Sequence, residues 1–375
     1  VLVVGGGGAF GSRLCAGLAA TLACEIVLAG RDRARAERAC AALRRHDPGA
    51  AVAAVALDGS RASAGTIAEL GVAAAVDAAG PYRPGAYGFA RACIGAGVPY
   101  IDLADGRAFV AGFSDALDAE ARRAGVPALC GASSTPALSN AALDAITRDW
   151  QAVTAVEVAI SPGNRAPRGL SVFESILAYV GRPVRVRRNG AWTEAPGWGL
   201  TQTRPMAGLG RRRLSLCETP DLDILPARRP ELRTALFRAG LELRILHDGL
   251  RLAALPVRTG LLPSLRPFAP AFRQAAAWFE RLGSDRGGME VVAEGRDATG
   301  RPTRATWFLV AEAGDGPFVP TLPALALVRR ILTGAPPAPG ARPCVGELTL
   351  AEIEAEMRRL RIRTGILTEP AAPRP

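Results

Sequence analysis

The chain opens with VLVVGGGGAFG, residues 1–11, and this stretch decides the fold. Four apolar residues of strand type lead directly into a glycine cluster, and a helix is expected from Ser12. One register of the cluster fits the pattern G-x-G-x-x-G, with glycines at Gly6, Gly8 and Gly11. In that pattern the first glycine allows a tight turn, the second lets the backbone approach a pyrophosphate, and the third lets the helix pack on the strand. The stretch therefore predicts a dinucleotide-binding loop.

Residues 1–139 continue as an alternation of short apolar strands and helices. Strands are expected at residues 1–4, 25–29, 52–57, 72–78, 98–103 and 126–130, with helices between them. This α/β alternation is typical of the Rossmann architecture, a doubly wound parallel sheet with helices on both faces. Ligands of such sheets bind at the carboxyl ends of the strands, so the loops there hold the candidate site residues.

The second strand ends in Ala29-Gly30-Arg31-Asp32. An acidic residue at this strand tip binds the ribose 2′-hydroxyl of NAD, whereas an arginine suits the 2′-phosphate of NADP. Arg31 therefore favours NADP(H) over NAD(H), although Asp32 could turn inward and take the ribose itself. The alternative for Arg31 is an ordinary surface arginine, since the chain has 46 arginines and no lysine.

Other strand ends complete the predicted cofactor site. Asp58, after the third strand, would lie beside the adenine, and the small residues after the fourth would let the ribose and nicotinamide approach the backbone. The predicted cofactor-binding residues are Gly6, Gly8, Ala9, Phe10, Gly11, Arg31, Asp32, Asp58, Ala79, Gly80 and Pro81.

The chain is poor in side chains that carry protons. All basic residues are arginine, and only His46 and His247 are histidine, which excludes Schiff-base lysines and His-rich metal sites; no metal is expected. Tyr82 follows the loop that would meet the nicotinamide and is the candidate catalytic residue; Tyr100, an Asp or a bound water are the other proton sources. The alternative for Tyr82 is a tyrosine packed at a domain interface.

Four further residues are candidates for substrate binding. Arg83, Ser133 and Ser134 could bind a carboxylate or a carrier phosphate, and Asp105 flanks the end of the fifth strand. The alternative for the two serines and for Asp105 is helix capping or hydrogen bonding within a loop.

Composition limits the partners and the compartment. The formal charge is +11, but the arginines are scattered and only 5% of residues are aromatic, so no nucleic acid partner is expected. Seven cysteines without a C-x-x-C pair are typical of a reduced, cytoplasmic protein. No uncharged apolar run reaches the roughly 18 residues of an integral membrane segment. The opening apolar run is too short for a secretory signal, and because Val1 already lies in a strand we expect a short segment before it.

The pattern changes after residue 139. An Asn189-Gly190 pair between two strand-like runs predicts a hairpin, and residues 289–295 and 303–310 predict an antiparallel pair. We therefore expect an α+β substrate domain with a mixed or antiparallel sheet over residues 140–345. Residues 346–375 are expected to hold a helix that runs to about Arg361, opened by a capping box at Thr349, and a disordered tail from Glu369; this helix could pack back on the first domain.

The strand-end loops together resemble the saccharopine dehydrogenase-like family of NAD(P)-dependent oxidoreductases. The resemblance rests on residues 6–11, 29–31, 77–82 and 100–105, with further similarity in PALCGASSTPALS (127–139) and in residues 314–350. It implies a Rossmann domain, a substrate domain built on a mixed sheet, and NADP(H) or NAD(H) between them.

Two branches of the family differ from the chain at residues 130–136, CGASSTP. Lysine-pathway saccharopine reductases carry a Gly-Leu-Asp-Pro-Gly type segment there, so saccharopine is not the expected substrate. Trans-acting enoyl reductases carry a Cys-Gly-Phe-Asp-Ser-Ile-Pro type segment, which is closer, but the chain lacks the Phe-Asp pair. The resemblance leaves the substrate open.

The predicted function is hydride transfer by an NADP-dependent oxidoreductase to or from a C=N, C=O or activated C=C bond. The substrate would be a small molecule or a carrier-bound group, and a homodimer is compatible with this function. The alternative is a non-catalytic NADP(H)-binding sensor or scaffold. The scarcity of acids and bases favours it, whereas the large second domain argues against it, since a sensor does not need one.

Overall fold

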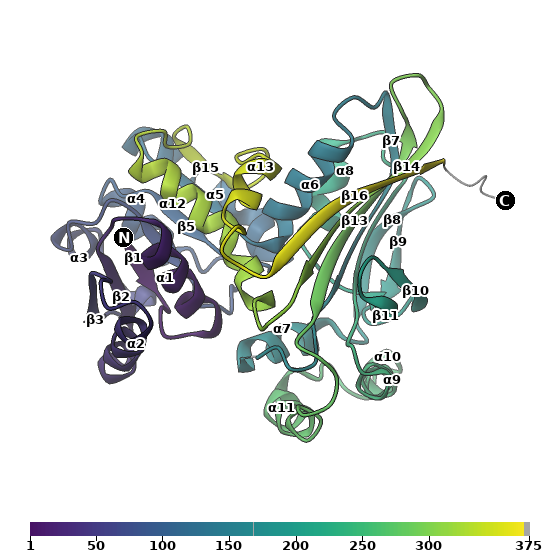
Figure 1. The fold of residues 1–375 in the computed structure, drawn as a ribbon, viewed down its shortest axis with the longest axis horizontal. Coiled ribbons are helices and arrows are strands. Elements are labelled where there is room, and N and C mark those ends of the chain that lie inside the picture. The colour runs from purple at the N-terminus through teal and green to yellow at the C-terminus, as the bar shows by residue number, and fades with distance from the viewer. Residues whose placement is uncertain (168, 371–375) are drawn as a thin grey trace. The chain divides into compact units, whose positions relative to one another are not determined.

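The computed structural model describes residues 1–167 and 169–370 (Figure 1). The chain divides into two compact units. The first contains residues Val1–Leu138 and Pro317–Glu356, and the second contains Ser139–Gly316 and the chain from Met357 onward.

The first unit is built on a seven-stranded sheet in which every neighbouring pair is parallel. Its strands are β1 (Leu2–Val4), β2 (Ile26–Gly30), β3 (Val52–Ala56), β4 (Ala75–Asp77), β5 (Tyr100–Asp102), β6 (Pro127–Cys130) and β15 (Gly340–Pro343). Their order is β3-β2-β1-β4-β5-β6-β15. The first six follow the dinucleotide-binding Rossmann order, so the predicted fold class is confirmed.

Helices connect these strands and pack beside them. They are α1 (Ala9–Thr21), α2 (Arg33–His46), α3 (Ala64–Glu69), α4 (Gly88–Gly95), α5 (Arg107–Ala124), α12 (Leu322–Leu332) and α13 (Leu350–Ala355). Side-chain caps set three of their starts: Asp32 accepts from the Arg35 N–H, Ser63 from the Thr66 N–H and Thr349 from the Glu352 N–H. Gly125 ends α5 in the left-handed conformation that glycine tolerates.

Residues 317–345 belong to the first unit, whereas the sequence placed them in the second domain. The reason is hydrogen bonding and apolar packing. β15 pairs with β6 as a seventh parallel strand, and the Cys344 N–H donates to the Cys130 carbonyl at 2.7 Å. α12 packs on α1, where the Leu325 side chain reaches Gly17.

The second unit is built on a nine-stranded mixed sheet, in which β7 and β12 are parallel and the other pairs are antiparallel. Its strands are β7 (Ala152–Ser161), β8 (Pro183–Arg188), β9 (Ala191–Pro196), β10 (Gln202–Met206), β11 (Gly210–Leu216), β12 (Thr234–Ala239), β13 (Gly287–Arg296), β14 (Pro302–Ala311) and β16 (Ile362–Pro370). Its helices are α6 (Ser139–Ile146), α7 (Leu170–Tyr179), α8 (Asp221–Arg228), α9 (Arg244–Ala253), α10 (Leu255–Arg258) and α11 (Ala269–Ala277). The predicted β13–β14 pair is confirmed.

The predicted β8–β9 hairpin is also confirmed. Asn189 and Gly190 take φ values of 51° and 86° at its turn, as a two-residue hairpin loop requires.

After the capping box at Thr349, the C-terminal segment has a shorter helix than predicted and then an additional strand. The Thr349 side chain accepts from the Glu352 N–H, as expected, but α13 ends at Ala355 rather than near Arg361. Residues 362–370 form β16, which pairs with β14, so Glu369 and Pro370 lie in a strand and not in a disordered tail. The cause is the open edge of β14, which this segment covers. Residues 371–375, also predicted to be disordered, lie outside the described residues.

The helices of the described residues include none that is both long enough and apolar enough to span a membrane.

One buried carboxylate gives a test of the C-terminal part of the first unit. The Glu356 side chain is 3% exposed and pairs with the Arg329 Nε at 2.6 Å. Arg329→Met would leave this carboxylate buried without its partner, so we expect the free energy of unfolding to fall by about 2 kcal/mol in urea denaturation.

The matched control is Arg33→Met. Arg33 pairs with Glu37 at 2.9 Å on the surface, where the two side chains are 69% and 55% exposed. Its loss should change stability by less than about 0.5 kcal/mol. Equal effects of the two substitutions would contradict the stabilising role of the Arg329–Glu356 pair.

Candidate dinucleotide-binding site

The loops that carry the predicted site residues begin at one edge of the parallel sheet. Val4 is level with Ala29 of β2 and with Asp77 of β4, and Asp77 is level with Asp102 of β5. Because the strands are parallel, all of their carboxyl ends face this edge. This is where an open α/β sheet binds its ligand.

The glycine cluster makes a tight turn whose positive φ, 77°, lies at Gly5. The Gly8 N–H closes the turn by donating to the Gly5 carbonyl at 2.8 Å. A Cβ on Gly11 would lie 2.8 Å from the Gly5 carbonyl carbon and would overlap its oxygen. The turn role predicted for Gly6 therefore belongs to Gly5, because only there does the backbone need a glycine φ. The packing role predicted for Gly11 agrees with this geometry.

Helix α1 presents free backbone donors at the end of this turn. Its N-cap residue is Gly8, so the helix has no side-chain cap, and its hydrogen bonding starts with the Ser12 N–H donating to the Gly8 carbonyl at 3.1 Å. The N–H groups of Ala9, Phe10 and Gly11 have no acceptor in the described part of the chain. Free N–H groups and the positive end of a helix dipole together suit a pyrophosphate.

Arg13 adds a positive charge near the same helix end, which the sequence analysis missed. Its Nη1 donates to the Ala9 carbonyl at 2.6 Å, and its guanidinium lies 5.9 Å from the centre of the Phe318 ring. Its Nε is buried without a hydrogen-bond partner, and burial lowers the pKa of the group. The sequence feature that could have indicated a role for Arg13 is its position one turn into the helix that follows the glycine cluster.

Asp32 caps α2 with its side chain. Its Oδ1 accepts from the Arg35 N–H at 3.0 Å, and its Oδ2 lies 3.9 Å from the Arg38 guanidinium. Arg31, beside it, is exposed. The carboxylate that would favour NAD is therefore engaged in helix capping, and Arg31 is the exposed charged group left at this strand tip.

Asp58 is held within its own loop. It caps a short 3-10 turn (Gly59–Arg61) by accepting from the Ser60 N–H at 3.0 Å and from the Ser60 hydroxyl at 2.7 Å. These hydrogen bonds lower the pKa of Asp58, and the charges of Arg31 and Arg61 lower it further. Arg31 follows β2, and Asp58 follows its neighbour β3.

Arg35, which is not among the predicted site residues, also reaches the glycine loop. Arg35, in the first turn of α2, donates from Nη2 to the Gly7 carbonyl at 3.3 Å. A Cβ on Gly7 would lie 3.5 Å from the Arg35 Cγ. Two arginines thus lie at this strand end: Arg31 in the loop between β2 and α2, and Arg35 in the first turn of α2.

The Tyr82 hydroxyl is engaged on both sides by backbone. It donates to the Asp77 carbonyl at 2.8 Å and accepts from the Leu103 N–H at 3.3 Å, so it links the ends of β4 and β5. Its ring packs against Phe109 with centroids 5.4 Å apart, and burial raises its pKa well above the usual value. This geometry gives Tyr82 a structural role and does not support the proton delivery predicted for it.

Asp102 is buried, and its carboxylate connects the end of β5 to the loop after β6 by hydrogen bonds. Its Oδ1 accepts from the Ala104 N–H at 2.9 Å and from the Gly131 N–H at 2.7 Å, and its Oδ2 accepts from the Tyr100 hydroxyl at 3.0 Å. Burial raises the pKa of Asp102 to about 7 and that of Asp77 to about 6.

The remaining predicted residues differ in exposure. Ala79, Pro81, Arg83 and Asp105 are exposed, and Gly80 is half-buried. Ser133 and Ser134 are only 6% and 9% exposed, and the Leu138 N–H donates to the Ser133 carbonyl at 3.1 Å. The two serines therefore belong to the buried turn that leads into α6, whereas Arg83 and Asp105 remain accessible.

No group of three or more His, Cys, Asp or Glu side chains in the described residues could hold a metal ion. His247 is fully buried, its Nε2 lies 2.9 Å from the Ser215 hydroxyl, and burial lowers its pKa to about 4.

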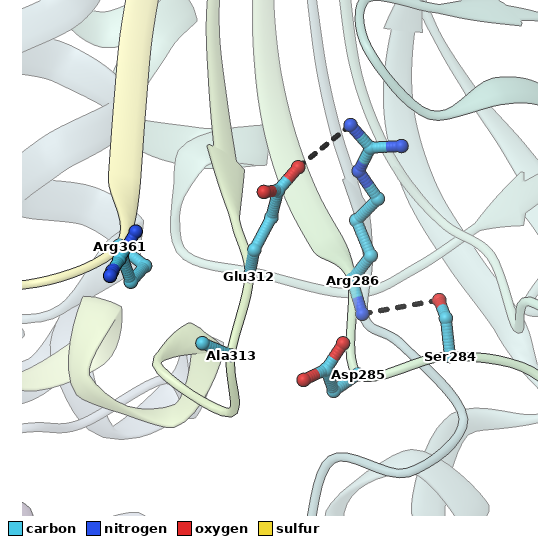
Figure 2. A pocket seen from close by; sticks show the side chains of 6 residues that line it. All are labelled: Ser284, Asp285, Arg286, Glu312, Ala313 and Arg361. Carbon is cyan, nitrogen blue, oxygen red and sulfur yellow. Dashed lines mark hydrogen bonds and ion pairs between the residues drawn. The ribbon is translucent and has the colours of Figure 1, made fainter.

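The second unit has an open pocket of about 580 Å³ that no predicted site residue lines (Figure 2). Arg286 pairs across it with Glu312 at 2.7 Å. The pocket is lined by Ser284, Asp285, Arg286, Glu312, Ala313 and Arg361.

The glycine turn, the uncapped α1 and the parallel strand order together describe a dinucleotide-binding domain. Comparison with protein families agrees. Residues 1–129 match the family described as Saccharopine dehydrogenase NADP binding domain. The resemblance inferred from the sequence is thereby confirmed for this domain, and the match supports a nicotinamide cofactor and an oxidoreductase.

One solved structure extends the likeness of fold to the whole chain. Apo saccharopine dehydrogenase (L-Glu forming) from Saccharomyces cerevisiae is 12% identical with a TM-score of 0.69, and the match covers 98% of this chain and 99% of the yeast chain. A probable dehydrogenase from Thermotoga maritima is 9% identical with a TM-score of 0.45, over 95% and 92% of the two chains. GenD2 from gentamicin A biosynthesis, in complex with NAD, is 15% identical with a TM-score of 0.41, over 95% and 90%. A search of curated proteins gave no match.

The contact between Gly11 and Gly5 can be tested by adding one methyl group. In Gly11→Ala the new Cβ would overlap the Gly5 carbonyl oxygen, so α1 must move away from the turn. We expect dinucleotide affinity to fall by more than about tenfold and stability by about 2 kcal/mol. Fluorescence titration with NADPH and urea denaturation measure the two effects.

The control for this substitution is Gly65→Ala in α3, where the new Cβ would meet only the Ser63 hydroxyl at 3.8 Å. It should bind NADPH like the wild type. Wild-type binding by Gly11→Ala would show that the close contact is not needed.

The raised pKa of Asp102 should make the stability of the folded protein depend on pH. Its folded pKa of about 7 lies above the unfolded value, so the folded protein keeps a proton that the unfolded chain releases. Stability should therefore fall as the pH rises from about 4 to about 7. In Asp102→Asn, which keeps an oxygen acceptor, this fall should be smaller by more than about 1 kcal/mol.

Unfolding curves across this pH range provide the measurement. Asp32→Asn, which changes an exposed aspartate and keeps an oxygen for its cap, should retain the wild-type profile. An unchanged profile in Asp102→Asn would mean that this carboxyl does not bind the proton.

Proposed function

We propose that the protein is an NADP(H)-dependent oxidoreductase that transfers a hydride to or from a C=N, C=O or activated C=C bond. The observation that carries this proposal is the uncapped N-terminus of α1, held against the glycine turn by the Gly11 contact. The family match of residues 1–129 supports the same cofactor class.

The glycine turn fits a pyrophosphate sterically. A Cβ on Gly8 would lie 3.0 Å from the Gly5 carbonyl oxygen and one on Gly7 would lie 3.5 Å from the Arg35 Cγ, so glycine at both positions keeps the turn free of side-chain atoms. The backbone N–H groups of Ala9, Phe10 and Gly11 would bind the phosphate oxygens. When bound, the nicotinamide supplies the hydride.

The arginines at the tip of β2 support NADP(H) over NAD(H). A 2′-phosphate carries charge that guanidinium groups pair with in bidentate fashion. Arg31 is exposed, Arg35 reaches over the glycine loop, and Asp32 is engaged in capping. No other acidic side chain follows β2 before α2 begins at Arg33.

The proton that accompanies the hydride is assigned to Asp77 or to a bound water. Tyr82 and Tyr100 each use their hydroxyl in a hydrogen bond, and Asp102 is fully buried. Asp77 is half-buried at the end of β4, and a pKa of about 6 lets its carboxyl exchange a proton near neutral pH.

The mixed sheet of the second unit would bind the substrate, which we place in the class of small-molecule or carrier-bound carbonyl, imine or enoyl compounds. The seven cysteines are all free, which supports a reducing compartment such as the cytoplasm.

A second candidate function is a non-catalytic NADP(H) sensor or scaffold. The engaged hydroxyls of Tyr82 and Tyr100 favour it, because they leave few proton donors at the strand edge. Both functions require that NADPH binds. Oxidation of NADPH with panels of keto, imine and enoyl compounds would distinguish the enzyme from the sensor.

The choice of cofactor can be tested at Arg31 and Arg35. The double variant Arg31→Ala, Arg35→Ala should weaken NADPH binding by about 10-fold to 100-fold and NADH binding by less than about threefold, since only NADPH carries the 2′-phosphate. Nicotinamide fluorescence titration measures both affinities.

Arg33→Ala is the matched control, because Arg33 lies between the two and pairs with Glu37 on the surface. It should bind both cofactors like the wild type. Equal weakening of NADPH and NADH in the double variant would remove the argument for a 2′-phosphate, and no binding of either cofactor by the wild type would overturn both candidate functions.

A further inference from the structure

Exposed apolar side chains gather in one part of the second unit. Leu261 is 79% exposed and Trp278 is 76% exposed. Elsewhere in the described residues, the large apolar side chains that are exposed number only four: Trp192, Leu332, Ile366 and Leu367. We call the gathered set the α9–α11 patch; it consists of Ile245, Leu252, Leu255, Leu261, Phe268, Trp278 and Leu282.

The segment that carries the α9–α11 patch is anchored by its opposite side. His247 and Leu250 of α9, Leu265 of the following loop and Ala269 of α11 are buried. α11 packs on α7, and α9 packs with α10. Figure 1 shows α11 next to α7, and α9 with α10 at the same end of the second unit beneath β10 and β11. Ile245, Leu252 and Leu255 lie on α9 and α10. The other four patch residues lie in the turns before and after α11.

Helical spacing places apolar residues and arginines side by side on α9 and α10. Ile245 and Leu252 are seven residues apart, which puts them on the same face, and Leu255 follows three residues later. Arg244 and Arg251 directly precede Ile245 and Leu252, so they are also seven residues apart and share a neighbouring face of the helix. The outer side thus carries an apolar stripe next to Arg244 and Arg251, with Asp248 between the two arginines. Apolar and basic residues side by side are typical of helices that lie in a membrane interface.

The charge of this segment is positive and largely unneutralised. Residues 244–282 contain six arginines against two acidic residues, a net charge of +4. The side chains of Arg244, Arg258 and Arg273 are exposed and make no hydrogen bond or ion pair within the described parts of the chain. Two other arginines of the segment are paired: Arg251 with Asp248 at 3.4 Å, and Arg266 with Glu174 of α7 at 3.7 Å.

We propose that the α9–α11 patch docks on an anionic phospholipid surface. Trp278, Leu261 and Leu252 would insert among the headgroups, and the unpaired arginines would contact the lipid phosphates. Tryptophan and arginine are suited to this boundary, because each combines an apolar part with a polar group. Such peripheral docking needs no membrane-spanning helix.

The basic charge argues against a second copy of the chain as the occupant. A symmetric dimer places the same surface of both copies together, so arginines that lack acidic partners would face the partner's arginines. An anionic bilayer neutralises them instead. The proposal concerns a surface outside the dinucleotide-binding domain and does not depend on the proposed enzyme activity.

Vesicle sedimentation with the full chain tests the proposal. The vesicles are phosphatidylcholine alone, or phosphatidylcholine with about one-third phosphatidylglycerol. We expect the protein to bind the anionic vesicles at least about tenfold more tightly, since each arginine near the surface contributes roughly a factor of five. Salt at about 0.5 M should release it, because the charges are then screened within a few ångströms.

Two variants separate the apolar and the basic contributions. The apolar variant carries Leu252→Ser, Leu261→Ser and Trp278→Ser, and the basic variant carries Arg244→Gln, Arg258→Gln and Arg273→Gln. Each should weaken binding to anionic vesicles by at least about tenfold. All six positions are exposed, so the variants are expected to fold, and thermal unfolding checks this.

Matched controls change the same chemistry elsewhere. Ile366→Ser with Leu367→Ser removes exposed apolar side chains from β16, and Arg45→Gln, Arg123→Gln and Arg188→Gln removes an equal charge. Both should bind anionic vesicles within about twofold of the wild type. If the basic variant and its control lose binding equally, net charge rather than the α9–α11 patch is responsible, and the proposal fails.

Two further results would overturn the proposal. One is that the wild type binds neutral and anionic vesicles equally well, or binds neither of them. The other is a wild-type dimer, seen by light scattering, that dissociates in the apolar variant while vesicles leave both proteins unbound.

Discussion

Helix α1 can approach the turn after β1 only because residue 11 has no side chain. The place of a Cβ on Gly11 is taken by the Gly5 carbonyl group, and the place of a Cβ on Gly5 is taken by the backbone of Ala78 at 2.9 Å. Strand, turn, helix and the loop after β4 are thus fixed against each other by backbone contacts. The direction of α1, and with it the position of its free N–H groups, follows from this packing.

Much of the first domain could be predicted because its signals are local. Short apolar strands, helix caps and the glycine cluster each lie within a few residues, and the order of the first six strands follows from the alternation. β15 could not be predicted in this way. Gly340 pairs with Pro127 more than two hundred residues earlier, and a four-residue strand with a proline has no pattern of its own. β16 was missed for a related reason, since it follows a capping box that indicates a longer helix.

The backbone conformation of the candidate site could be predicted from the sequence, but the partners of its polar side chains could not. The glycine turn is encoded by residue type, but the function of a polar side chain depends on the partner that the fold supplies. Tyr82 reads equally well as a proton donor and as a structural residue until its hydroxyl is found between the Asp77 carbonyl and the Leu103 N–H. Asp32 was ambiguous in the same way, because a capping aspartate and a ribose-binding aspartate occupy the same place in the sequence. Arg35 was overlooked because its importance depends on the direction of α2 toward Gly7.

The path of the chain between the two units has a consequence for how the protein is made. The chain leaves the first unit after Leu138, returns to it at Pro317, and leaves it again after Glu356. The seventh strand of the first sheet is therefore synthesised after eight of the nine strands of the second sheet, and the last of those nine comes later still. During translation, β6 remains an open sheet edge until β15 has left the ribosome, and β14 remains one until β16 has followed. Each unit is completed by the same final segment of about sixty residues, so neither corresponds to a single continuous stretch that could be expressed or exchanged between proteins on its own.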